Sequence, residues 1–205
     1  MPLSNRLIHL VFVAALSTLS APSAYATIFE YQATLTGPSE SPPNASPANG
    51  FAFVTFDDFA NTEHVNVSFS GLIGTTTASH IHAATAVPFT GTAGVATTTP
   101  TFTGFPLGVT SGTYDNTFDL MMASSFNSAY ITANGGTPAS AEAALLAAAA
   151  AGEAYLNIHT TVVPGGEIRG FLTPVPEPET YAMLLAGLGL LGFMARRRMD
   201  QTVAA

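Results

Sequence analysis

Three histidines offer the clearest chemistry in this sequence. His80 and His82 are two residues apart in a stretch that predicts a β-strand, so both imidazoles project from the same face. His159 lies in a second predicted strand, where Asn157 shares its face. Three imidazoles that converge on one sheet face would suit copper or zinc, because the chain contains no cysteine to supply sulfur ligands.

The same histidines also fit a structural role, in which they hydrogen-bond loop carbonyls at one end of the fold. Their spacing leaves both interpretations open, and redox catalysis would also require an open coordination position. Glu167 and Arg169 are two residues apart in the last predicted strand, and with Asn157 they are candidate supporting groups. We expect Arg169 to form an ion pair with Glu167 or with another nearby carboxylate.

Alternating apolar and polar residues predict a β-rich domain over residues 27–173. One short Ala-rich helix is predicted over residues 140–151, after the capping residue Thr137 and Pro138. A Thr- and Gly-rich stretch at 90–103 has no periodicity and predicts a long loop. Turn-forming residues separate seven strand candidates, at residues 29–35, 51–56, 65–69, 79–83, 117–121, 154–160 and 168–172. This pattern predicts an all-β fold, either an antiparallel β-sandwich or a barrel.

The charge balance excludes one large class of function. Residues 27–173 contain ten carboxylates and one arginine, a net charge of about −9, and the chain has no lysine. A nucleic-acid-binding protein needs a basic surface to neutralise phosphates, so this class is excluded. Common cofactor and hydrolase patterns such as GxGxxG, the P-loop and GxSxG are missing.

The N-terminal residues 1–26 predict a secretory signal peptide. Arg6 precedes a short apolar stretch, and Ala24 and Ala26 are the small residues expected before the cleavage site of signal peptidase. A retained N-terminal anchor is the alternative interpretation. Cleavage after Ala26 would make Thr27 the first residue of the mature chain.

The C-terminal part has three components in a defined order. A proline-rich segment precedes an apolar stretch at 181–195 that predicts a single hydrophobic helix, and an arginine cluster follows. The positive-inside rule places the cluster on the cytoplasmic side of a membrane, with residues 199–205 as a cytoplasmic tail. The motif residues are Val175, Pro176, Glu177, Pro178, Arg196, Arg197 and Arg198.

This order of parts resembles a PEP-CTERM sorting signal over residues 174–198. The resemblance implies a protein that a Gram-negative bacterium exports across its inner membrane. It also implies a transient membrane anchor, processing by an exosortase, and transfer to the cell surface or release into the extracellular space. A permanent single-span anchor is the alternative.

Three stretches between residues 27 and 173 together resemble the CHRD domain of chordin and of many bacterial exported proteins. They are Ala33–Pro43, Gly71-Leu72 with Ser79-His80-Ile81-His82, and Asn157-Ile158-His159-Thr160 with Gly166-Glu167-Ile168-Arg169-Gly170. The resemblance implies an immunoglobulin-like β-sandwich with a likeness to copper/zinc superoxide dismutases. The order of His80, His82 and His159 is similar to that of the dismutase copper site. The bridging histidine, zinc cluster and disulfide of the dismutases have no counterpart here.

These features predict an exported protein with one β-sandwich domain. The favoured function is a non-enzymatic surface or matrix module whose partners are extracellular polysaccharide or surface proteins. The alternative is a copper- or zinc-binding exported protein with a His80/His82/His159 site, which could be redox-active. A third alternative is calcium-dependent polysaccharide binding through acidic residues, namely Asp57, Asp58, Asp115 and Asp119, whose spacing matches no EF-hand.

Overall fold

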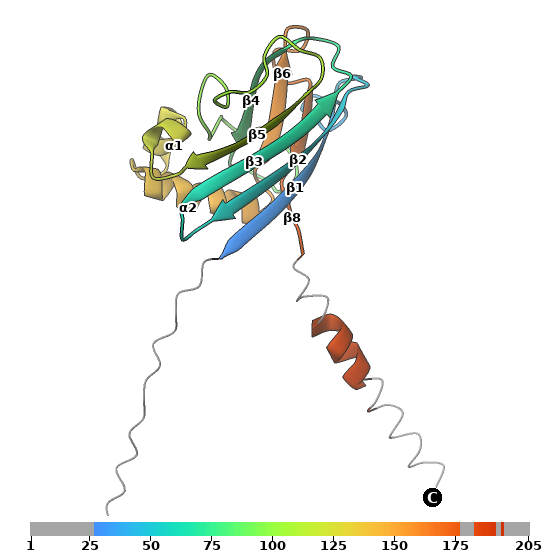
Figure 1. The fold of residues 1–205 in the computed structure, drawn as a ribbon, viewed down its shortest axis with the longest axis vertical. Helices are drawn as coiled ribbons and strands as arrows, with labels where there is room; N and C mark the ends of the chain where they lie inside the picture. The colour runs from blue at the N-terminus through green and yellow to red at the C-terminus, as the bar shows by residue number, and fades with distance from the viewer. Residues whose placement is uncertain (1–26, 177–182, 192–193, 195–205) are drawn as a thin grey trace, which may run out of the picture.

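The computed structural model describes residues 27–176, 183–191 and 194, and its main feature is one curled antiparallel β-sheet (Figure 1). Seven strands follow the order β4-β6-β7-β1-β2-β3-β5, and β8 also pairs with β1. Their bounds are β1 Ile28–Thr36, β2 Asn49–Asp57, β3 Thr62–Ser70, β4 Thr76–His82, β5 Gly112–Asp119, β6 Tyr155–Thr160, β7 Ile168–Phe171 and β8 Thr173–Pro174. The predicted all-β class is confirmed, and each predicted strand overlaps an observed one.

Along β1, β2 and β3 buried side chains alternate with more exposed ones, so one face of these strands forms the core. In the paired register Tyr31 lies opposite Val54, and Val54 lies opposite Val65, and all three side chains are buried. Their neighbours Gln32 and Asn66 are exposed on the other face. Burying one such apolar side chain stabilises the fold by about 1.5–3 kcal/mol, so the register that buries them all is strongly favoured.

The predicted Ala-rich helix is α2, Pro138–Ala150. Thr137 caps it by accepting a hydrogen bond from the Ser140 N–H, and Gly152 follows its end with a φ of +72° that glycine adopts without strain. A second helix, α1 (Ser128–Ala133), and a 3₁₀ turn, η1 (Ala123–Ser125), were not predicted. Both helices lie at one end of the sheet (Figure 1).

The stretch predicted as a long loop, residues 90–103, has no regular strand or helix but packs closely on β4. Ala96 and Phe102 are fully buried. The Ile81 N–H donates to the Thr97 hydroxyl at 3.0 Å, and the Phe102 N–H donates to the Ser79 carbonyl at 3.0 Å. Because these bonds fix the loop against β4, its carbonyl groups take defined positions beside that strand.

The two targeting segments lie largely outside the described residues. The signal peptide, residues 1–26 with Ala24 and Ala26, falls wholly outside them, as do Glu177, Pro178 and the arginine cluster. In the predicted hydrophobic stretch, residues 183–191 and 194 are helical. Within the ranges that the structure describes, no helix is long and apolar enough to cross a membrane.

Candidate metal centre

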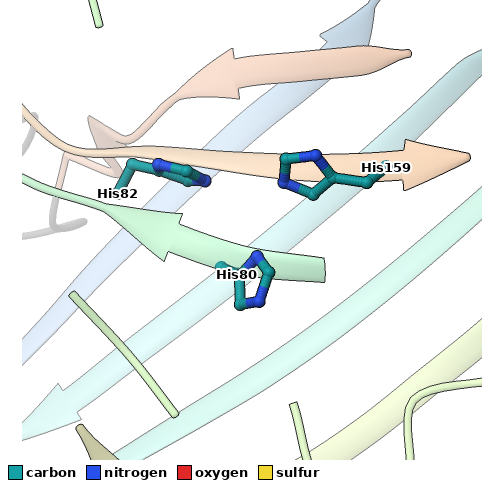
Figure 2. Close-up of side chains that lie close together, drawn as sticks. All are labelled: His80, His82 and His159. Carbon is teal, nitrogen blue, oxygen red and sulfur yellow. The ribbon is translucent and has the colours of Figure 1, made fainter. Parts of the chain in front are cut away.

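The paired strands β4 and β6 bring the three histidines together. His80 and His82 lie on β4, and His159 lies on β6, where Ala78 is its partner in the register. Leu156 and Ile158 alternate with His159 and point into the core, so the three rings occupy the opposite face of the sheet. Figure 2 shows the rings gathered above the two strands.

The rings are close enough for one ion to reach all three. Their centroids are 5.3 Å apart for His80 and His159, and 5.8 Å apart for each pair that includes His82. One ring nitrogen from each histidine lies within 4.8 Å of the others, and no other such group of three ligand residues occurs in the described part of the chain. Small rotations of the rings would bring these nitrogens to bonding distance of a shared ion.

Each ring is held by a backbone carbonyl from a loop. His80 Nε2 lies 2.7 Å from the Pro100 carbonyl, and His82 Nδ1 lies 2.9 Å from the Ala93 carbonyl. His159 Nδ1 lies 2.9 Å from the Pro164 carbonyl. Since a carbonyl only accepts, the ring nitrogen must donate in each case, which assigns the tautomer.

The nitrogens that remain are His80 Nδ1, His82 Nε2 and His159 Nε2, and all three are buried without a hydrogen-bond partner. Burial lowers the pKa of each ring, and it lowers that of His82 to about 4. At neutral pH the three rings are therefore uncharged, and each presents a lone pair toward the others. Outer hydrogen bonds to carbonyls with free inner lone pairs are the arrangement of metal-bound histidines.

An aromatic and a cationic side chain complete the surroundings of His82. Tyr155 stacks on its ring, with centroids 4.8 Å apart and an interplanar angle of 6°. The guanidinium of Arg169 lies 4.6 Å from the centre of the Tyr155 ring on the same face of the sheet. It donates to the Ser39 carbonyl at 2.6 Å and to the Gly91 carbonyl at 2.9 Å.

Arg169 was predicted to pair with Glu167 or another nearby carboxylate, and the second alternative is confirmed. Its nearest carboxylate is Glu40, which lies buried with Oε2 3.7 Å from Arg169 Nε. Burial raises the pKa of Glu40 to about 7, although the charge of Arg169 opposes that change. Glu167 was the wrong partner because β7 begins at Ile168, so the two residues do not share a strand face.

Glu167 instead joins three segments of the chain. Its carboxylate accepts hydrogen bonds from the Ser46 hydroxyl, the Thr160 hydroxyl and the backbone N–H groups of Ile73 and Gly74. Burial raises the pKa of Glu167, but these hydrogen bonds outweigh burial and the pKa is lowered. This residue stabilises the loops around the centre rather than supplying a ligand to it.

Other predicted groups have separate positions. Asn157 is buried on the histidine face, opposite His80 in the register, and its Oδ1 has no partner. His64 lies outside the centre and pairs with the exposed Asp115 at 3.0 Å. Asp57 and Asp119 cap neighbouring backbone N–H groups. The acidic residues proposed for calcium therefore do not form a common ligand group in the described part of the chain.

Sequence reasoning missed Tyr155, Glu40 and the three loop carbonyls. Tyr155 could have been found, because it alternates with Asn157 and His159 along β6 and must share their face. The carbonyls of Ala93, Pro100 and Pro164 have no sequence signal, since every residue carries a carbonyl.

A single-domain all-β protein with a histidine cluster under its loops is the class that the fold and the site define. The CHRD domain matches residues 31–172, and the chain therefore belongs to the CHRD domain family. The PEP-CTERM protein-sorting motif matches residues 174–198. Comparison with curated proteins and with solved structures finds no match for the chain. With this motif the chain is an exported protein that an exosortase processes.

Proposed function

We propose that this CHRD domain is an exported metal-binding module in which His80, His82 and His159 hold one copper or zinc ion. The observation that carries the proposal is the set of three buried ring nitrogens, uncharged and without partners, within reach of one another. A buried acceptor without a hydrogen bond costs about 1–3 kcal/mol, and three in one place would be an unexplained cost for a structural cluster. A bound ion would satisfy all three.

The donor set limits the choice of ion. Neutral imidazoles suit copper and zinc, whereas calcium and magnesium need oxygen ligands. The chain has no cysteine that could compete for the ion. A bound ion would act as a Lewis acid and would also connect β4, β6 and the three loops that hold the rings.

The test is the metal content of the full chain, exported in a bacterial host and purified in mild detergent. After equilibration with a small excess of copper and zinc and removal of unbound ions, mass spectrometry should find close to one ion per chain. A His80→Ala/His82→Ala variant should lose the ion. The matched control is His64→Ala, which removes a histidine outside the centre and should retain it. Folded wild-type chain that retains no metal would overturn the proposal.

A second candidate is a non-enzymatic surface module that binds extracellular polysaccharide or surface proteins. The observation that favours it is the outer face of β1, β2, β3 and β5. Phe51 is 44% exposed there, between Thr34 and Ser68 in the register. An aromatic ring beside hydroxyl groups can stack on a sugar while its neighbours hydrogen-bond to it. Deletion of the gene would then alter cell aggregation or biofilm, Phe51→Ala would reproduce that change, and the histidine variants would behave like wild type.

We also propose the finer sorting route that the PEP-CTERM motif supports: a transient anchor in the inner membrane of a Gram-negative bacterium, followed by cleavage and transfer to the surface. Val175 donates its N–H to the Glu30 carbonyl at 2.8 Å, so the sheet holds the chain up to the start of the motif. Cleavage beyond that point would leave the domain intact. Mass analysis of the surface protein should find the residues after the motif removed, whereas a permanent anchor would leave full-length chain in the inner membrane.

A further inference from the structure

The surroundings of the histidine centre are poor in negative charge. Imidazole binds a metal as a neutral donor, and no Asp or Glu among the described residues belongs to the group that His80, His82 and His159 form. A cation placed between the rings would therefore keep its full charge.

Arg169 is the fixed cation beside the centre. Its guanidinium is buried against Tyr155, which in turn stacks on His82. Glu40, the carboxylate nearest to Arg169, is also buried, with Oε2 3.7 Å from Arg169 Nε, and it does not belong to the histidine group. The guanidinium is therefore the charged group that contacts the aromatic ring beside His82.

The lack of a nearby carboxylate and the presence of Arg169 favour a monovalent ion over a divalent one. The cost of moving an ion from water to a medium of low dielectric rises with the square of its charge, so a divalent ion costs about four times as much as a monovalent ion of similar size. Repulsion from Arg169 is about twice as large for the divalent ion. Neutral ligands without a nearby carboxylate add no opposite charge that would compensate for either term.

The number of nitrogen ligands also favours monovalent copper. Zinc in proteins is almost always four-coordinate, so a three-histidine site must supply it with a water or another ligand. Monovalent copper accepts three nitrogen ligands in a plane and needs no fourth ligand. The three free nitrogens are shielded from solvent, and no fourth His, Cys, Asp or Glu belongs to the group within the described part of the chain.

We propose that the centre selects monovalent copper over zinc and divalent copper, so that the CHRD domain holds copper in its reduced state. This inference rests on the proposed function, because it identifies the ion that the same three histidines bind. It requires no electron transfer by the protein: copper would arrive already reduced, and the site would hold it away from solvent.

The test measures affinities of the purified full chain by competition. Monovalent copper is supplied with excess ascorbate and bicinchoninate under nitrogen, and zinc and divalent copper are supplied with chelators of known affinity. We expect monovalent copper to bind about a thousandfold more tightly than zinc, and more tightly than divalent copper, with an X-ray absorption edge typical of three-coordinate monovalent copper. Zinc or divalent copper bound as tightly as monovalent copper, with loss in His80→Ala/His82→Ala, would overturn this inference and leave the proposed function intact. No binding of any ion would overturn both.

A variant that adds a negative charge beside the rings tests the electrostatic argument separately. Asn157→Asp places a carboxylate of equal size on the histidine face, opposite His80. It should shift the affinity ratio toward zinc by about tenfold or more, which corresponds to about 1.4 kcal/mol. The matched control is Asn49→Asp, the same change at an exposed position on β2, and it should leave the ratio unchanged. Equal ratios in both variants, each with a cooperative melting curve, would contradict the charge argument.

Discussion

Glu63 makes the fold sensitive to pH for a reason that can be worked out from its position. It is fully buried on β3, between Phe56 and Phe118 in the register, and neither carboxylate oxygen has a hydrogen-bond partner. Burial raises its pKa from 4.5 to about 8. The folded chain therefore holds Glu63 as a neutral acid at pH 7.

The size of the effect follows from the difference between the two pKa values. Each unit corresponds to 1.36 kcal/mol, so the difference between 4.5 and about 8 corresponds to about 5 kcal/mol. Above pH 4.5 Glu63 ionises in the unfolded chain only, which favours unfolding. Its contribution to stability is thus fully present below pH 4.5 and is lost as the pH rises toward 8. At pH 7 the loss amounts to roughly 3 kcal/mol.

The perturbation is Glu63→Leu, which keeps the volume and removes the titrating group. Its free energy of unfolding would be compared with that of the metal-free wild type by urea denaturation, followed by far-UV circular dichroism, between pH 4.5 and 8. Because Glu40 and other carboxyl groups titrate in both proteins, the difference between the two isolates Glu63. That difference should favour the variant and should grow by about 3 kcal/mol from pH 4.5 to pH 7.

Glu30→Leu serves as the control, because Glu30 is exposed on β1. It should stay within ~0.5 kcal/mol of wild type at each pH. If the difference between Glu63→Leu and wild type were constant from pH 4.5 to 8, Glu63 would ionise in the folded chain as readily as in water. The argument from burial would then be wrong.

Three further predictions concern the loops and the rings. Glu167→Gln should lower the free energy of unfolding by about 2–4 kcal/mol in urea at pH 7, since a neutral amide replaces a charged acceptor of four hydrogen bonds. The lowered pKa of Glu167 means that its contribution disappears as the pH falls through the folded value, so the two proteins should converge in acid. Gly166→Ala should reduce the melting temperature by several degrees, about 2 kcal/mol, because φ is +129° and the added Cβ would lie 2.7 Å from Glu40 Oε1 and against Asn157. In the metal-free chain the NMR signals of the His82 ring should titrate near pH 4; a midpoint near 6.5 would show that the ring is open to water.

The fold was predictable where the sequence pattern has a local physical cause. Residues 29–35 and 65–69 alternate between apolar and polar because every second side chain of β1 and β3 enters the core. Residues 51–56 form a compact apolar stretch, and every second side chain of β2 is buried. The capping residue, proline and terminal glycine of α2 act within a single turn of the helix, so they too can be read locally. By contrast, α1 has only six residues, and it forms where Asn127 caps it and Tyr130 packs into the core.

The ligand residues of the candidate site could be predicted from the sequence, but the groups that contact and orient them could not. Spacing places His80 and His82 on one face, but only the pairing of β4 with β6 brings in His159 from 77 residues away along the chain. The partner of Arg169 depends on where β7 begins and on the turn that carries Glu40, and neither is encoded within a few residues of Arg169. The position of His159 and the partner of Arg169 are both set by contacts between residues that are distant in the sequence.

Glu63 and the three histidines all have buried polar atoms without hydrogen-bond partners, but only the histidines form a candidate binding site. Glu63 is surrounded by the apolar core, and taking up one proton removes its charge. Protonation does not satisfy the histidines in the same way. The loop carbonyls already occupy their outer nitrogens, and each proton added to an inner nitrogen would repel the neighbouring ring and Arg169. A single cation shared by the three inner nitrogens satisfies all of them at once. Convergence of the unpartnered atoms, rather than their number, is therefore what distinguishes a binding site from a local cost of folding.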